Sequence, residues 1–425
     1  MVSNCVHKVL LSCLLGFCLA PPAAAKTTFV VFPLENQSRV QTLSWIGEGL
    51  AIAISEEMQM PNIETISWEE RVRFVESSDL PPNTPLSRAS MIRIAQRAAA
   101  DKMVFGSYTG TEDNLRIVLR VLDVKSLRMG GEKVANGPLT ALPQLENELA
   151  WEILSDGGWN GILSRADFRA RTRTVPNKPY SSFIACLSVT DEEERSKLLL
   201  KTVELYRNFP QAAFLLGAHY YQSGDCLKAI PYLKQALTEA QNLLETEFML
   251  GTCYLKQDNA AEAIQAYSAF MGRDQALEVL NNLGVAYLRR GDYPLAVQNL
   301  IEARKVARTD VTVGLNLALL RHIEGDEAAA LAVLEELVRS HPEQGIVQYL
   351  YSLALSSRGE AEKAAAALEQ AQKLGIDPEK MKRQDPRNWA RIFPSWTRRP
   401  GLAWAGAVKI TGATIDRSGA NRQRH

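Results

Sequence analysis

Apolar residues follow two different periods along this chain. From Thr27 to about Gly158, short runs rich in β-branched and aromatic residues alternate with amphipathic stretches. From Gln211 onward, the apolar positions keep a helical spacing. A period of two predicts strands and a period near 3.6 predicts helices. The pattern therefore predicts an α/β domain followed by an all-helical region.

The amino-terminal pattern predicts strands and helices in alternation. Strands are expected at 29–32, 63–66, 103–108, 115–124 and 133–135, and helices at 42–58, 68–76, 87–100 and 142–154. Gly130-Gly131 suits a turn before the last strand. This order favours a mixed sheet covered by helices.

The helical region is a repeat of about 34 residues, a period typical of stacked helical hairpins. Small residues begin segments that are 34, 33, 34 and 34 residues apart: Gly217, Gly251, Gly284, Ala318 and Ser352. Seven residues later comes a turn residue: Gly224, Asp258, Gly291, Gly325 or Gly359. A polar residue suited to cap the next helix follows each turn. Five hairpins are therefore expected over 210–377.

The segments LLGAHYYQSGDCLKAIPYLKQAL and NLGVAYLRRGDYPLAVQNLIEA resemble the tetratricopeptide repeat. The resemblance covers Gln211 to Leu374 and implies an all-α solenoid that binds proteins. A degenerate sixth copy over 180–209 would put Phe183 at the small position and Asp191 at the turn. The alternative, that 180–209 is not a repeat, stays open.

The region 26–158 carries a second resemblance. Its segments VVFPLENQS, WIGEGLA, DKMVFGSY and LRIVLRVLDVKSLRMGGE resemble the TolB amino-terminal-like domain in order and spacing. The resemblance implies an assembly module of bacterial envelope proteins. A linker at 159–179, rich in Arg from Arg165 onward, is expected to join it to the repeats. Pro81 to Pro85 departs from the family pattern and suits a rigid surface loop. Asn36 and Ser38 either meet a ligand at a helix start or only form a turn.

The first 25 residues have the pattern of an export signal. His7 and Lys8 precede an apolar run from Val9 to Ala20, and three alanines precede Lys26. This predicts cleavage near Ala25 and a periplasmic or exported protein. An uncleaved anchor is the alternative, although the run is short of the roughly 20 residues that span a bilayer. A lipoprotein site at Cys13 is a further, weaker alternative.

Three cysteines remain after such cleavage: Cys186, Cys226 and Cys253. Cys226 and Cys253 fall on adjacent expected hairpins and could pair. Isolated cysteines in helices are more often small buried apolar residues. We therefore expect free thiols, with pairing as the alternative.

Charge and motifs argue against several functional classes. The chain has 48 Lys plus Arg and 48 Asp plus Glu, so it has no general attraction to nucleic acid. Its sequence lacks a phosphate-binding loop ending in Lys-Ser or Lys-Thr, a Gly-x-Ser-x-Gly elbow and a Cys-x-x-Cys pair. We expect no catalytic residues, no cofactor and no metal site.

The resemblance to tetratricopeptide repeats implies a binding surface on the first helix of each pair. Taking Pro210, Leu244, Leu277, Val311 and Gly345 as first positions places twelve candidate residues on the concave face. These are Phe214, Tyr221, Phe248, Leu255, Asn281, Asn282, Val285, Leu288, Arg289, Leu315, Asn316 and Leu319. An apolar peptide or partner helix would suit this face. If the register is off by one residue, the apolar members are interhelical core instead.

Asn282 and Asn316 occupy the same repeat position, 34 residues apart. In some family members an asparagine there hydrogen-bonds the backbone of an extended peptide, because an amide offers both a donor and an acceptor. Alternatively, both satisfy groups on a neighbouring helix.

The carboxy-terminal part, 378–425, combines a capping segment with a basic tail. From Arg387 onward there are seven Arg and one Lys against one Asp, with Trp389, Trp396 and Trp404 interspersed. Such a tail could touch an anionic membrane surface. Because it shows no sustained period, we expect it to be poorly ordered.

Together these features predict a non-catalytic interaction scaffold of the bacterial cell envelope that binds a peptide or partner helix. The alternative is a ligand- or glycan-sensing amino-terminal domain that signals through the repeats.

Overall fold

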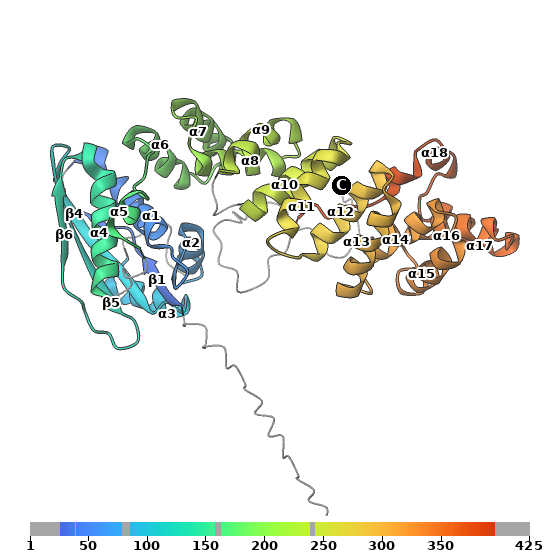
Figure 1. The fold of residues 1–425 in the computed structure, drawn as a ribbon, viewed down its shortest axis with the longest axis horizontal. Helices are drawn as coiled ribbons and strands as arrows, with labels where there is room; N and C mark the ends of the chain where they lie inside the picture. Colours follow the sequence, from blue (N-terminus) through green and yellow to red (C-terminus); the bar gives the residue numbers. More distant parts are fainter. Residues whose placement is uncertain (1–25, 39, 79–85, 158–162, 239–242, 396–425) are drawn as a thin grey trace, which may run out of the picture. The chain divides into compact units, whose positions relative to one another are not determined.

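A computed structural model describes residues 26–38, 40–78, 86–157, 163–238 and 243–395. The expected signal peptide, the Pro81–Pro85 loop and the tail beyond Ser395 lie outside the described residues. The chain divides into two compact units between Arg173 and Thr174 (Figure 1).

The first unit contains a six-stranded mixed sheet. Its elements are β1 (Thr27–Val31), β2 (Glu35–Asn36), α1 (Ile46–Met58), β3 (Ile63–Thr65), α2 (Trp68–Glu76), α3 (Arg88–Arg97), β4 (Lys102–Thr111), β5 (Asn114–Asp123), β6 (Lys133–Gly137), α4 (Leu142–Asp156) and α5 (Arg165–Arg169). The strand order is β3-β1-β4-β5-β6, with β2 paired to β4. Strand β1 runs parallel to β3 and β4, whereas β4, β5 and β6 pair antiparallel.

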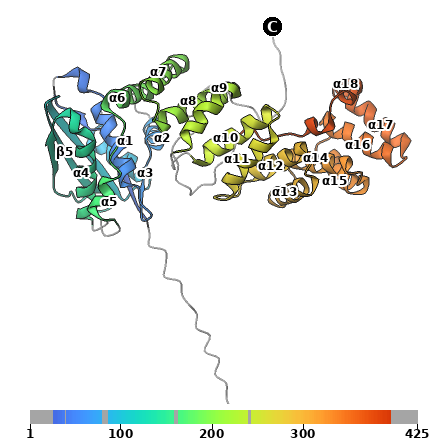
Figure 2. The same cartoon turned by 45° about the horizontal axis from the view of Figure 1, so that its top comes forward.

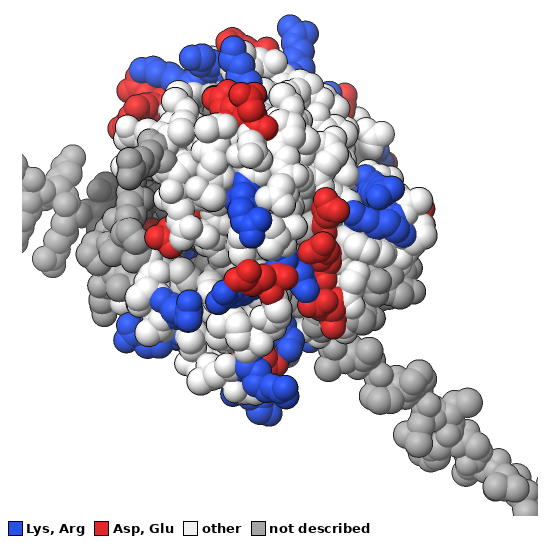
Figure 3. Space-filling model, turned by 90° about the vertical axis from the view of Figure 1, so that its left-hand side faces the viewer, with Lys and Arg blue, Asp and Glu red and all other residues white. Residues whose placement is uncertain are grey.

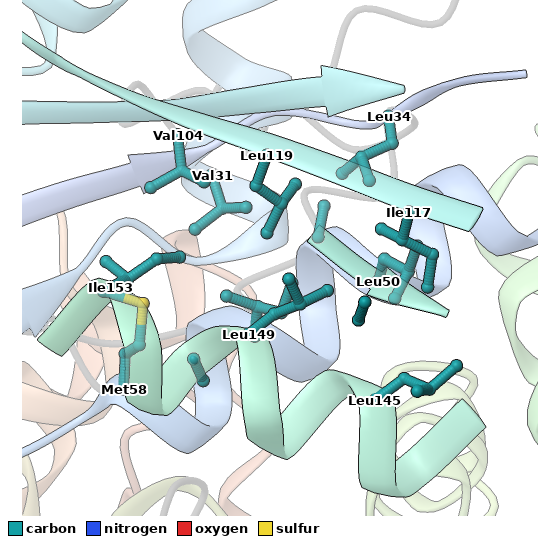
Figure 4. Packing of buried hydrophobic residues seen from close by; sticks show 14 of the residues in the cluster. Val31, Leu34, Leu50, Met58, Val104, Ile117, Leu119, Leu145, Leu149 and Ile153 are labelled. Carbon is teal, nitrogen blue, oxygen red and sulfur yellow. The ribbon is translucent and has the colours of Figure 1, made fainter. Parts of the chain in front are cut away.

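Both faces of the central strands are buried. Phe29 and Val31 of β1 pack into the cluster formed with α1 and α4, part of which Figure 4 shows. Val30 of β1 points the other way, into a second cluster that includes Ile94 of α3. This alternation follows from the two-residue period of a strand. The predicted mixed sheet covered by helices is confirmed.

The first helix begins later than its apolar pattern suggested. A 3₁₀ turn at Gln41–Leu43 comes first, and α1 starts at Ile46. A Cβ at Gly47 would lie 2.2 Å from the backbone oxygen of Leu34. Only glycine permits this close approach.

The second unit is a series of antiparallel helical pairs. The helices are α6 (Asn177–Leu187), α7 (Glu192–Leu205), α8 (Pro210–Gln222), α9 (Cys226–Ala236), α10 (Leu243–Lys256), α11 (Ala260–Met271), α12 (Leu277–Arg290), α13 (Tyr293–Val306), α14 (Val311–Ile323), α15 (Glu327–Ser340), α16 (Gly345–Ser357), α17 (Ala361–Lys373) and α18 (Pro378–Lys382). Buried side chains of successive pairs form continuous apolar clusters. The predicted all-α solenoid is confirmed.

The small and turn positions of the repeat behave as predicted. A Cβ at Gly251 would lie 2.7 Å from the ring of Tyr267, sixteen residues on. Gly217 and Gly284 approach Leu233 and Leu300 in the same way. All five turn residues have left-handed backbones: Gly224, Asp258, Gly291, Gly325 and Gly359. The side-chain caps are less regular, because Asp225 and Asp326 accept from the following helix whereas Asn259, Asp292 and Glu360 do not.

The prediction of free thiols is wrong for two of the cysteines. Cys226 and Cys253 form a disulfide, with their Cα atoms 5.1 Å apart. Packing of the start of α9 against α10 places the two side chains together, and the sequence spacing of 27 residues did not show this. Cys186 is a free, buried cysteine whose sulfur donates to the Ser182 oxygen at 3.1 Å.

Candidate peptide-binding face

The first helices of the pairs, α8, α10, α12, α14 and α16, form what we call the first-helix face. Residues 386–395, the docked segment, lie on it. They follow α18, begin with a 3₁₀ turn at Pro386–Trp389 and continue without regular secondary structure to Ser395. Figures 1 and 2 show this red segment returning from α18 toward α12. The repeats thus hold a peptide from their own chain.

Two asparagines each hold both backbone groups of one residue of this segment. Asn282 accepts from the Phe393 N–H at 2.8 Å and donates to the Phe393 oxygen at 2.9 Å. Asn316 accepts from the Arg391 N–H at 2.8 Å and donates to the Arg391 oxygen at 2.7 Å. Both amides are buried. A carboxamide can make this double contact because it offers one acceptor and a donor to the N–H and C=O of an extended residue.

A network of buried polar groups orients these amides. Asn281 accepts from Asn316 at 2.8 Å and donates to the Asn282 oxygen at 3.2 Å and to the Arg391 oxygen at 3.1 Å. Asn282 also donates to the Tyr267 hydroxyl at 3.1 Å. Burial raises the pKa of Tyr267, so its hydroxyl remains protonated. The amides are therefore held in place by the fold beneath the peptide.

Side chains of the docked segment fill apolar positions between the helices. Trp389 makes an edge contact with the ring of Tyr349, with centroids 5.6 Å apart. Ile392 packs against the apolar clusters on both sides of α12. Phe393 packs beside Leu280 and Val313. These contacts add side-chain selection to the backbone contacts.

The polar ends of the segment are also bound. Arg387 donates to the Arg289 backbone oxygen at 3.2 Å, and the Tyr221 hydroxyl donates to the Pro394 oxygen. Burial raises the pKa of Tyr221 to about 12. Arg391 donates to the Gln344 side chain at 3.3 Å, and burial lowers the pKa of its guanidinium.

Between Trp389 and Phe393, the contacts run opposite to the order of the repeats, whereas Arg387 meets the third pair at Arg289. Trp389 meets Tyr349 of the fifth pair, Arg391 meets the fourth pair and Phe393 meets the third. Two residues of peptide therefore correspond to one repeat. Such a spacing is expected of an extended chain, in which alternate residues present their backbone groups to the same side.

The structure brings some of the predicted site residues together and places others elsewhere. Tyr221, Asn281, Asn282 and Asn316 touch the docked segment through their side chains, and Arg289 through its backbone. The seven apolar candidates are buried in the helical clusters: Phe214, Phe248, Leu255, Val285, Leu288, Leu315 and Leu319. The Arg289 side chain donates to the Leu255 oxygen at 2.7 Å.

Sequence reasoning missed the docked segment and the hydrogen bond from Asn282 to the Tyr267 hydroxyl. The expectation of a poorly ordered tail does not hold for Arg387 to Ser395. A cluster of apolar residues between Pro386 and Pro394 was the available signal. Trp389 is half-buried and its ring lies against that of Tyr349.

The amino-terminal unit buries charged groups of another kind. Glu146 is fully buried and pairs with Arg173 through hydrogen bonds of 3.0 and 3.1 Å. Burial, reinforced by Glu146, raises the pKa of Glu57 to about 8, while Asn147 and Arg171 act in the opposite direction. Asn36 accepts from Ser38 at 2.9 Å, a local turn contact.

The described residues contain neither a metal-binding cluster nor a membrane-spanning helix. Within them, no group of three or more His, Cys, Asp or Glu side chains could hold a metal ion. Within the same residues, helices are too short or too polar to cross a bilayer. On the face shown in Figure 3, acidic and basic side chains are interspersed among uncharged ones.

A family model described as tetratricopeptide repeat matches residues 248–305 and 324–379. These helical pairs are tetratricopeptide repeats. Among curated proteins, BBSome complex member BBS4 from Bos taurus is 23% identical over 185 residues, which is 43% of this chain and 36% of that protein. The chain therefore matches about a third of the length of this relative.

Each of the following solved structures is similar to about two fifths of the chain. A crystal structure of MamA is 22% identical, covers 40% of this chain and 98% of its own, and has a TM-score of 0.36. YrrB, described as a TPR protein with an unusual peptide-binding site, is 16% identical over 44% of this chain and 98% of its own, with a TM-score of 0.37. MamA from Desulfovibrio magneticus RS-1 is 15% identical over 41% and 97%, with a TM-score of 0.37.

Proposed function

We propose that this protein is a non-catalytic scaffold whose repeats bind an extended peptide of a partner protein through its backbone. The observation that supports this most directly is the pair of double contacts made by Asn282 and Asn316 to Phe393 and Arg391. These amides already hold a peptide in the required conformation. A partner peptide would use the same donors and acceptors.

The site suits binding because the orientation of the two amides is fixed by the fold before a peptide binds. The side chains of Asn281 and Tyr267 fix their orientation, so little ordering is needed on binding. A net hydrogen bond contributes about 0.5–1.5 kcal/mol. Loss of the four bonds made by Asn282 and Asn316 should therefore weaken binding by about 2 kcal/mol or more.

We further propose that the protein works outside the cytoplasm, in the bacterial cell envelope. The predicted signal at 1–25 and the resemblance of 26–158 to a TolB-like assembly domain motivate this. The disulfide between Cys226 and Cys253 supports it, because such bonds persist in oxidising compartments. A fusion of residues 1–40 to a reporter active only after export tests the signal. Activity retained after its apolar run is replaced by polar residues would contradict the proposal.

The binding function is tested by capture of envelope proteins on the chain from Lys26 to His425. A partner recovered by this chain should be lost from the variant Asn282→Ala with Asn316→Ala. The control is Asn299→Ala, which removes a half-buried amide on α13 that donates to the Leu295 oxygen of the same helix. Equal recovery of every partner by the double variant and the control would show that these amides do not bind partners.

A further inference from the structure

We propose that the docked segment is a displaceable internal ligand, and that the external partner is an extended segment of the same chemistry. Such a partner carries an aromatic residue and, three and four residues later, an apolar pair, as Trp389, Ile392 and Phe393 do. It must displace residues 386–395 before it binds. This inference rests on the proposed function and identifies both its ligand class and its competitor.

The docked segment has the contacts of a ligand rather than of a folded element. It makes no regular secondary structure after Trp389, and the repeats hold alternate residues, Arg391 and Phe393, by their backbones. Of residues 386–395, only Ala390 is buried, and the others are half-buried or exposed. The segment is therefore not enclosed by the helices on which it lies.

The solenoid beneath has its own core. Leu315 and Leu319 of α14 and Val285 of α12 are almost fully buried among helical neighbours. Asn282 and Asn316 would face water if the segment left, and water can satisfy an exposed amide. Local release is consequently compatible with an intact repeat array.

Partner chemistry follows from the sites that the segment occupies. The ring of Tyr349 receives an aromatic edge, and the apolar surroundings of Ile392 and Phe393 exclude charged side chains. The Tyr221 hydroxyl donates to a backbone carbonyl oxygen. This contact therefore sets no requirement on the side chain of the residue that follows the apolar pair. The site thus selects an aromatic residue followed by an apolar pair, with the backbone extended.

Tethering determines how strongly the internal ligand competes. Only residues 383–385 separate α18 from the segment, so its docking is intramolecular. Short tethers give effective concentrations in the millimolar range. A partner peptide must therefore bind against this competitor, and its affinity for the native chain is lower than for a chain whose own segment cannot dock.

The test uses the purified chain from Lys26 to His425 and a fluorescent peptide, PRNWARIFPS, with the sequence of residues 386–395. The double variant Arg391→Pro with Phe393→Pro, the opened chain, lacks the two N–H groups that donate to Asn316 and Asn282. Its own segment should therefore no longer dock on the first-helix face. Ser395→Pro is the matched control, because it introduces proline at an exposed residue just beyond these contacts. We expect the opened chain to bind the peptide at least tenfold more tightly than the native chain and the control.

Two additions show whether the amides carry the binding. Asn282→Ala with Asn316→Ala in the opened chain should reduce peptide affinity at least tenfold. A peptide N-methylated at the residues corresponding to Arg391 and Phe393 should bind the opened chain equally poorly. Equal affinity of native and opened chains, with the same helical circular dichroism, would overturn the proposal.

Hydrogen exchange of the native chain gives a result even if the opened chain does not fold. The Arg391 and Phe393 amides should exchange at least a hundredfold faster than buried amides of α12 and α14, and faster still with excess peptide. Exchange at the same rate as those helices would show that the segment is a fixed part of the fold. A native dimer that the proline pair dissociates would instead assign the segment to a second copy, and would overturn internal docking.

Failure of this inference and failure of the proposed function are distinguishable. If the peptide binds the opened chain but no envelope protein depends on Asn282 and Asn316, the site exists without the proposed scaffold role. If an envelope partner depends on them and the segment does not exchange, the scaffold role stands and internal competition is wrong.

Discussion

The two units bury polar side chains for different purposes. In the amino-terminal unit, Glu146 is paired with Arg173 of the same unit. In the repeat unit, Asn282 and Asn316 are buried beneath a peptide segment whose backbone they hold. A charge that is paired inside a unit belongs to its folding, whereas an amide that meets a peptide can serve binding. Substitutions should therefore affect stability in the first unit and docking in the second.

The largest expected effect is the pH dependence of the amino-terminal unit. Glu57 is nearly fully buried, and its pKa rises from 4.5 to about 8. The folded unit binds this proton more tightly than the unfolded chain does. Its contribution to stability is therefore complete below about pH 4.5 and is lost as pH rises through about 8, at about 1.4 kcal/mol per pH unit.

The measurement is urea unfolding of the chain between pH 5 and 8, followed by hydrogen exchange of α1 and α4. Glu57→Gln should flatten the dependence and make the unit more stable at pH 8. The charged groups that act on Glu57 are Glu146, Arg171, Glu56 and Arg165. An unchanged slope in the variant would assign the dependence to another carboxyl group, because the two arginines keep their charge in this pH range.

The next effect comes from breaking the buried ion pair. Glu146→Ala leaves the largely buried guanidinium of Arg173 without its carboxylate. Removing one partner of a buried pair costs about 3–5 kcal/mol. We expect this loss in the unfolding free energy of the amino-terminal unit, with amide exchange in α12 and α14 unchanged. Glu148→Ala, in the same helix but exposed, is the matched control. An equal effect of both variants would show that the pair adds nothing specific.

A smaller loss is expected from filling a close approach in the repeats. Gly251→Ala would place a methyl group 2.7 Å from the Tyr267 ring. Overpacking of this kind costs about 1–3 kcal/mol. Because Tyr267 also supports Asn282, docking of residues 386–395 should weaken as well. Thermal unfolding and exchange at Phe393 measure the two effects, and Gly131→Ala, whose Cβ would meet nothing within 4 Å, is the control.

The two units differ in how far their sequences predicted them. Alternating burial in β5 and the spacing of about 34 residues between Gly217, Gly251 and Gly284 reflect local geometry, so they predicted elements and hairpins correctly. The Cys226–Cys253 disulfide and the docking of Phe393 on Asn282 depend on how distant segments meet. Neither the disulfide nor the docking produces a repeating pattern in the sequence. The asparagine pair was visible in sequence, but the peptide that it holds was not.

The smallest effect gives the sharpest test of the comparison. Asn281 stands at the fifth position of its repeat, where the other copies carry Phe214, Phe248, Leu315 and Tyr349. Asn281→Leu should preserve folding stability, since an apolar residue suits this position. It removes one bond to the Arg391 oxygen and the two that orient Asn316 and Asn282. At about 1 kcal/mol net, docking should weaken roughly fivefold, seen as faster exchange at Arg391. If stability falls while exchange at Arg391 relative to α14 is unchanged, the Asn281 amide contributes to folding and not to docking. The contrast between buried polar groups for folding in the first unit and for binding in the second would then be wrong at this residue.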